Sequence, residues 1–134
     1  MERLTTNKPV EEMSMTELAH NSCYAKDRKA RYRDYEMDID ARDFARKLML
    51  EFGEWKHIEE YGLDADNELV DDDIFDDTML DNLQYEPTTT IGLIALFYRN
   101  LWAMADLHTR LKAYEDAEEQ ALARMEDNNG KHED

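Results

Sequence analysis

Several residue types that build common functional sites are scarce in this sequence. A single cysteine, Cys23, excludes an internal disulfide and any metal site made of several thiolates. Only four glycines occur in 134 residues, and the motifs G-x-x-x-x-G-K-[ST], G-x-G-x-x-G, G-x-S-x-G and H-E-x-x-H are missing. The sequence therefore predicts a binding protein rather than an enzyme, with no cofactor.

Long hydrophobic segments are also missing. The N-terminus lacks the apolar core of a secretory signal. The longest apolar run, residues 91–98, is far shorter than the roughly 20 residues that cross a bilayer. We expect a cytoplasmic protein with no membrane partner.

Positive charge is scarce overall and absent from one long segment. The chain has 16 Lys and Arg against 33 Asp and Glu, a formal net charge of −17. Between Ile58 and Tyr98 there are twelve acidic residues and no Lys or Arg. Such a charge repels phosphates, which excludes direct binding to nucleic acid through the whole surface. A strongly basic protein, or a cation, is the partner that the charge favours.

Local signals predict two helices in the first half of the chain. Ser14 and Glu17 form an S-x-x-E capping box, which starts a helix at about Met15. Asp38 or Asp40 can serve as the N-cap of a second helix. Apolar residues then repeat every three or four positions to residue 52.

Two further helices are predicted after residue 70. The first is acidic and ends before Pro87, because the residue before a proline avoids helical dihedrals. The second runs from Thr90 to Glu126. Its predicted buried side consists of Leu93, Ile94, Phe97, Leu101, Met104, His108 and Leu111. Since no strong strand pattern occurs, the predicted fold is all-α, a compact bundle of about four helices with one long C-terminal helix.

The predicted organisation is a single domain. Residues 1–13 form an irregular lead-in, residues 14–126 form the helical domain, and residues 127–134 form a disordered tail. Within the domain, residues 58–86 form an acidic segment. The thin apolar stripe in the second half of the last helix, from Leu101 to Met125, allows a homodimer.

A basic island interrupts the acidic sequence at residues 24–35. It carries five Lys and Arg side chains with three interleaved tyrosines, and it either continues the first helix or breaks into a loop. Alone, this composition suggests contact with single-stranded nucleic acid. In so acidic a chain, pairing with the acidic segment is the favoured interpretation.

Two E-x-x-H pairs raise the alternative of a metal-binding bundle. Glu17 with His20 and Glu54 with His57 match the spacing that di-iron bundles place on two of their helices. A complete site needs two further inward glutamates, and glutamate is abundant in this chain. Polar surface histidines are the preferred interpretation, and no metal ligand is assigned.

A calcium loop is suggested and then excluded by the same segment. Asp64, Asp66 and Glu68 stand at the first, third and fifth positions of an EF-hand pattern. The pattern also requires Gly at the sixth position and Glu at the twelfth, where this chain has Leu69 and Phe75. The segment is not an EF-hand.

The acidic segment is the candidate partner-binding site. Acids in a first helical turn, or on a solvated face, explain part of the charge. They do not explain why no cation accompanies them, because surface helices usually mix signs. Carboxylates three and four residues apart can imitate phosphates in a basic groove. The candidate residues are Asp64, Asp66, Glu68, Asp71, Asp72, Asp73, Asp76, Asp77 and Asp81.

Three stretches carry a resemblance to known proteins: MERLTTNKP, NSCYAKDRKARYRDYEMDIDARDFARKL and RLKAYED. They resemble small proteins encoded by phages and prophages of gut bacteria of the Firmicutes type. The resemblance implies a phage accessory role inside a bacterial host cell. Small acidic phage proteins include anti-CRISPR proteins and other DNA mimics that block host nucleases.

Charge and resemblance together predict an inhibitor of a host defence nuclease. A Cas9-type CRISPR effector is the favoured target, because it holds nucleic acid in a positively charged channel. One alternative is a phage structural or assembly protein that dimerises through its C-terminal helix. The other is the metal-binding helical bundle.

Overall fold

The computed structural model describes residues 2–52, 72–85 and 88–132. The chain divides into two compact units. Unit 1 comprises Met1–Asp38 and Ala103–Asp134, and unit 2 comprises Ile39–Trp102. The predicted all-α fold is wrong, because helices are joined by a three-stranded sheet with the order β1-β2-β3. The fold is mixed α/β with a long C-terminal helix.

The segment that ends at Asp40 contains short elements, and the last of them passes along the chain from unit 1 into unit 2. A 3-10 helix, η1, spans Val10–Glu12 and is followed by α1 (Met15–Asn21), β1 (Cys23–Lys26), β2 (Lys29–Arg33) and β3 (Asp38–Asp40). The predicted capping box is confirmed: the Ser14 hydroxyl accepts from the Glu17 amide at 3.1 Å, and the Glu17 carboxylate accepts from the Ser14 amide at 3.1 Å. These two bonds fix where α1 begins.

The strands correct the interpretation of the basic island. Its residues form an antiparallel hairpin in which Cys23 pairs with Tyr32 and Lys26 with Lys29. The two turn residues, Asp27 and Arg28, have φ of 53° and 64°. Positive φ at both central positions is the requirement of a type I′ turn, whose twist matches that of the strands. Because neither residue is glycine, the usual sequence signal for such a turn is missing.

We expect Arg28→Gly to stabilise the hairpin. A non-glycine residue in the left-handed region is strained, and glycine adopts it freely at the cost of more entropy in the unfolded chain. The net gain in free energy of unfolding is expected to be about 0.5–1 kcal/mol. Urea denaturation measures it, with Lys26→Gly as the control, because that strand position should lose stability. A loss of stability in Arg28→Gly would contradict the turn geometry.

The N-terminal segment of unit 1 is attached to the second half of α4 (Thr90–His132). The Glu115 carboxylate accepts from the Leu4 amide at 2.8 Å and from the Thr5 amide at 3.0 Å. The Arg3 guanidinium bonds Glu119 at 2.7 Å. These contacts hold the predicted irregular lead-in against the helix.

Unit 2 is built from α2 (Ala41–Glu51), α3 (Asp72–Tyr85) and the first turns of α4. Asp40 is the N-cap of α2, as one of the two predicted candidates, and its carboxylate accepts from the amides of Arg42 and Asp43. The core of the unit draws on all three helices and consists of Ala45, Met49, Phe75, Met79, Ile91, Ile94, Ala95 and Tyr98.

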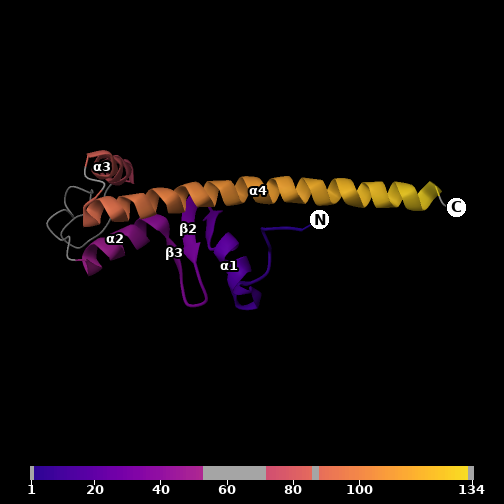
Figure 1. Cartoon of the computed structure of the whole chain (residues 1–134), viewed down its shortest axis with the longest axis horizontal. Coiled ribbons are helices and arrows are strands. Elements are labelled where there is room, and N and C mark those ends of the chain that lie inside the picture. Colours follow the sequence, from indigo (N-terminus) through magenta and orange to yellow (C-terminus); the bar gives the residue numbers. More distant parts are fainter. Residues whose placement is uncertain (1, 53–71, 86–87, 133–134) are drawn as a thin grey trace. The chain divides into compact units, whose positions relative to one another are not determined.

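The long helix α4 forms as predicted but differs in extent and in its buried face. Figure 1 shows it as one uninterrupted helix, which continues to His132 through residues that were predicted to be a disordered tail. Ile94 and Leu101 are buried as predicted, whereas Leu93 is 63% exposed. Phe97, Met104 and Leu111 are also exposed. The inward face instead uses small residues such as Ala95 and Ala105, which permit close approach of neighbouring elements.

In the described residues, no helix combines the length and the apolarity that crossing a bilayer requires.

Candidate interaction site

The acidic helix α3 is anchored by apolar residues on one side and exposes acids on the other. Phe75 is fully buried and Met79 is 3% exposed, so both belong to the core of unit 2. Asp73, Asp77 and Asp81 are exposed and recur every four residues. At 100° per residue, these three acids lie on the side of the helix away from Phe75 and Met79.

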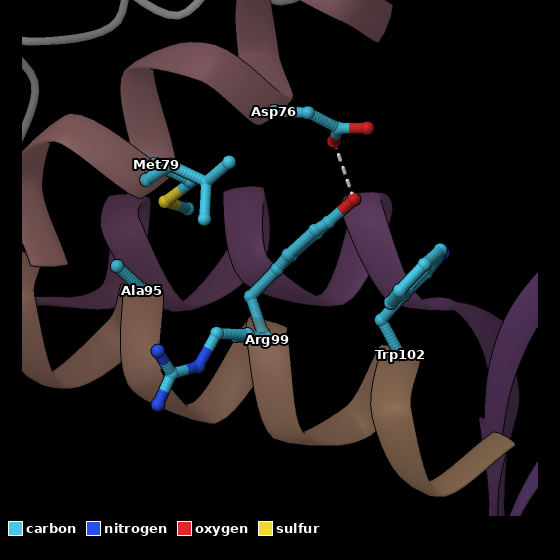
Figure 2. Close-up of a pocket in the computed structure, with 7 residues that line it drawn as sticks. Asp76, Met79, Ala95, Arg99 and Trp102 are labelled. Carbon is cyan, nitrogen blue, oxygen red and sulfur yellow. Dashed lines mark hydrogen bonds between the residues drawn. The ribbon is translucent and has the colours of Figure 1, made fainter. Parts of the chain in front are cut away.

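A polar network fixes α3 to its neighbours. The Arg42 guanidinium of α2 binds the Asp76 carboxylate in a bidentate manner, with Nε–Oδ1 at 3.1 Å and Nη2–Oδ2 at 2.8 Å. The Tyr98 hydroxyl of α4 donates to Asp76 Oδ1 at 2.6 Å, which is the dashed line in Figure 2. A second acid, Asp72, lies 3.7 Å from Arg42 Nη1. Asp76 therefore joins the three helices of unit 2.

Two groups of this network have pKa values above their ordinary values. The pKa of Arg42 is raised, chiefly by its hydrogen bonds with Asp76. Burial raises the pKa of Tyr98 well above 10, and the Asp76 carboxylate beside the hydroxyl raises it further. Both groups therefore hold their protons at neutral pH and remain hydrogen-bond donors to Asp76.

The predicted site residues therefore have different roles. Asp73, Asp77 and Asp81 face solvent, while Asp76 faces inward and positions the helix. Asp72 is half-buried beside Arg42. The remaining candidates, Asp64, Asp66, Glu68 and Asp71, lie outside the described residues.

An apolar pocket of about 290 Å³ opens between α3 and α4 beside this network. Figure 2 shows Met79 on α3 and Ala95 on α4 at its wall, with the Arg99 guanidinium pointing away from the Asp76 carboxylate. Leu80 and Trp102 also line it and are 53% and 57% exposed. The surface around α3 therefore combines carboxylates with an opening that fits an apolar side chain.

The basic island forms contacts within its own hairpin and its neighbours. Arg31 binds Asp38 at 2.8 Å, and Tyr24 also donates to Asp38. Arg33 donates to the Asn21 carbonyl at 3.0 Å and stacks 4.2 Å from the ring centroid of Tyr24. Most of the acidic segment lies outside the described residues, so the predicted pairing of the island with that segment stays a prediction.

Only the first of the two E-x-x-H pairs, Glu17 with His20, lies within the described residues. Glu17 binds Lys8 at 2.9 Å and caps α1, while His20 is exposed. Glu54 and His57 lie outside the described residues. Over residues 2–52, 72–85 and 88–132, no group of three His, Cys, Asp or Glu side chains is placed to hold a metal ion.

Sequence reasoning missed the residues that attach α3 to α2 and α4. Arg42 is 34 positions from Asp76 in sequence, and Tyr98 is 22 positions from it. The one available signal was the unbroken acidity of the segment, which requires a cation from elsewhere for any acid that turns inward. That signal does not say which arginine supplies it.

Comparison with known proteins adds no further identification. The chain matches no protein-family model, and neither a curated protein nor a solved structure matches it.

Proposed function

We propose that the protein inhibits a basic, nucleic-acid-binding protein of a bacterial host by inserting the acidic side of α3 into its nucleic-acid groove. The favoured target is a Cas9-type CRISPR effector, whose channel is positively charged and which reads its PAM with arginines. The protein would then act as a DNA mimic encoded by a phage. Asp73, Asp77 and Asp81 are the proposed contacts within the described residues.

One observation carries this proposal: exposed carboxylates recur on a helix that contains no cation. The 14 residues of α3 include five aspartates and no Lys, Arg or His. Unit 2 as a whole carries sixteen acidic and five basic residues. Side chains four residues apart on a helix are separated by about 6 Å along its axis. This is close to twice the spacing of about 3.4 Å between phosphates along one DNA strand.

Two further features support a protein partner. The Arg42–Asp76–Tyr98 network holds α3 in place before binding, and a preorganised surface loses less entropy on association. The apolar pocket beside the acids can accept one anchoring side chain from the partner. Duplex DNA offers no such side chain, so the apolar pocket favours a protein partner. The proposed interface therefore includes an apolar contact in addition to the charged ones.

Reversing the three exposed acids is expected to abolish inhibition. We expect the triple variant Asp73→Lys, Asp77→Lys, Asp81→Lys to bind a guide-loaded Cas9-type effector at least about tenfold more weakly, because each reversal adds repulsion to a lost attraction. DNA cleavage and competition with a PAM-containing duplex measure the effect. Wild-type binding should also weaken as salt rises.

A matched control separates the site from bulk charge. Glu118, Glu126 and Asp127 are exposed on α4, and reversing them to Lys changes the net charge by the same amount. This control should retain inhibition. Equal losses in both triple variants, or no binding of the effector by the wild-type protein, would contradict the proposal. Far-ultraviolet circular dichroism checks that each variant remains folded.

Self-association through α4 is the second candidate function. Met104, Leu107, Leu111 and Tyr114 are spaced alternately by three and four residues and are 45%, 58%, 37% and 69% exposed. This spacing is that of a coiled-coil seam. A stable dimer in sedimentation equilibrium, with no effect on any nuclease, would favour a phage assembly protein.

A further inference from the structure

Unit 1 contains a polar cavity that is basic although the chain is acidic. Its volume is about 320 Å³. Four elements contribute to it: the N-terminal segment, β1, β2 and α4. The lining residues are Thr6, Asn7, Lys8, Tyr24, Ala25, Arg33, His108, Thr109 and Lys112. We call it the basic cavity, and none of its lining residues is a carboxylate.

The cations of the basic cavity retain unused hydrogen-bond donors. Lys8 donates to Glu17 at 2.9 Å and Lys112 to Asp116 at 3.0 Å, and an ammonium group has three donors. Arg33 uses Nε on the Asn21 carbonyl. Among the described residues, no carboxylate lies within ion-pair distance of Arg33, so both of its terminal NH₂ groups remain available.

The neutral groups of the basic cavity are fixed by their own bonds. The Thr6 hydroxyl accepts from the Lys8 amide at 3.2 Å, which leaves its proton available to donate. The Tyr24 hydroxyl donates to Asp38, and the Arg33 guanidinium covers one face of the Tyr24 ring. A flat aromatic group therefore cannot stack on that face, whereas an anion can approach the guanidinium from its edge.

The tautomer of the neutral His108 ring is set by its neighbour Asn21. The Asn21 amide nitrogen donates to the carbonyls of Leu4 and Glu17, so its oxygen faces the Thr6 amide and His108 Nε2 at 3.0 and 2.8 Å. Since that oxygen only accepts, Nε2 carries a hydrogen. In the neutral ring, Nδ1 is then the unprotonated nitrogen.

The charges around His108 disfavour its second proton. Burial lowers its pKa, and Arg33 on β2 and Lys112 on α4 lower it further, while Glu115 acts in the opposite direction. An anion in the basic cavity would neutralise part of this positive field. Binding of such an anion must therefore raise the pKa of His108, and protonation must in turn strengthen binding.

We propose that the basic cavity binds the phosphate group of a small molecule, with Arg33 and Lys112 as its principal contacts. A phosphate dianion accepts several charge-assisted hydrogen bonds, which is what three cations and a hydroxyl around one cavity supply. The volume exceeds that of the phosphate alone and lies at the lower end of the range for small-molecule sites. The site is built from side chains, which agrees with the shortage of glycine for a phosphate-binding loop.

Nuclear magnetic resonance titration of the full chain tests this proposal. The probes are inorganic phosphate and ribose 5-phosphate at constant ionic strength, with sodium chloride as the reference anion. We expect saturable shifts of the Thr6, Lys8 and Arg33 amides and an upward shift of the His108 pKa. A larger response to ribose 5-phosphate identifies a phosphorylated metabolite, and a larger response to phosphate identifies the free ion. Absence of saturation with both probes would overturn the proposal.

The variants separate the basic cavity from general charge effects. Arg33→Gln should weaken binding at least about tenfold, the effect of one charge-assisted hydrogen bond. Arg28→Gln removes the same charge from the exposed hairpin turn and should leave binding unchanged. If the nuclear magnetic resonance spectrum of Arg33→Gln is no longer that of a folded protein, Lys112→Gln is the variant that tests the proposal. Lys112→Gln should weaken binding without altering the fold. Equal binding by Lys112→Gln and wild type, or equal weakening by Arg28→Gln, would contradict the assignment.

Discussion

Replacing Phe75 with alanine is expected to lower the free energy of unfolding by about 3–5 kcal/mol, because it empties a fully buried aromatic site. The ring packs edge-to-face on Tyr98, with centroids 5.3 Å apart and an angle of 90°. On α2, the Arg46 guanidinium lies 5.6 Å from the centroid of the Phe75 ring. The substitution therefore removes contacts to both helices that anchor α3, and the acidic surface should lose its order with them.

Urea denaturation followed by circular dichroism measures this loss. Leu80→Ala is the matched control, since Leu80 lies on the same helix and is 53% exposed. It should cost less than about 1 kcal/mol. If Phe75→Ala costs no more than Leu80→Ala, α3 does not dock on α2 and α4 through this ring.

Replacing Glu115 with alanine is expected to lower the free energy of unfolding by about 2–4 kcal/mol, because it removes hydrogen bonds to a charged group and leaves buried donors unsatisfied. The residue is 4% exposed, and its carboxylate accepts from two backbone amides and from the Thr5 hydroxyl at 2.5 Å. Hydrogen bonds to charged groups stabilise a fold more than neutral ones do, and their loss leaves the buried Thr5 donors unsatisfied. The N-terminal segment should detach from α4.

Acid should reproduce part of this effect. Burial alone would raise the pKa of Glu115, but the hydrogen bonds from Thr5 and Leu4 outweigh it, so the pKa is lowered from 4.5. A lowered folded-state pKa means that the stabilisation is complete above pH 4.5 and is lost as pH falls through the folded value. Glu115→Ala should therefore be less acid-sensitive than wild type. Glu118→Ala, an exposed change on the same helix, should keep the wild-type acid profile. Identical profiles for wild type and Glu115→Ala would contradict this role.

Local sequence signals predicted the helices well. The Ser14 capping box, the Asp40 N-cap and the end of α3 at Tyr85, just before Pro87 in the sequence, each depend on residues within a few positions of one another. Such signals act through backbone donors at a helix end and through fixed dihedrals, so they can be read without knowing the rest of the fold. The starts of α1 and α2 and the end of α3 follow from them.

The hairpin was missed because its signals conflict with its structure. The basic island was predicted either to continue the first helix or to break into a loop, whereas Tyr24 and Tyr32 lie on paired strands. The turn places Asp27 and Arg28 at positive φ, where glycine and asparagine are the usual residues. Strand pairing with neighbouring segments outweighed the local preference of these residues.

The arrangement of side chains at the two proposed sites depends on contacts that the sequence does not display. Acidic composition identified α3 as a surface, but which aspartates face inward is decided by Arg42 and Tyr98. The basic cavity brings together Lys8, Arg33 and Lys112, which are widely separated along the chain. A net charge of −17 hid this local concentration of positive charge.

The division of the chain into units has a consequence for its synthesis on the ribosome. Unit 2 is one continuous stretch, whereas unit 1 joins the first 38 residues to residues after 102. The bonds from Leu4 and Thr5 to Glu115 span 111 and 110 residues, so they cannot form until α4 has emerged. Although its residues are translated first, the N-terminal segment must wait for its binding partner on the helix. Unit 2, the unit with the acidic surface, can therefore fold before unit 1 is complete.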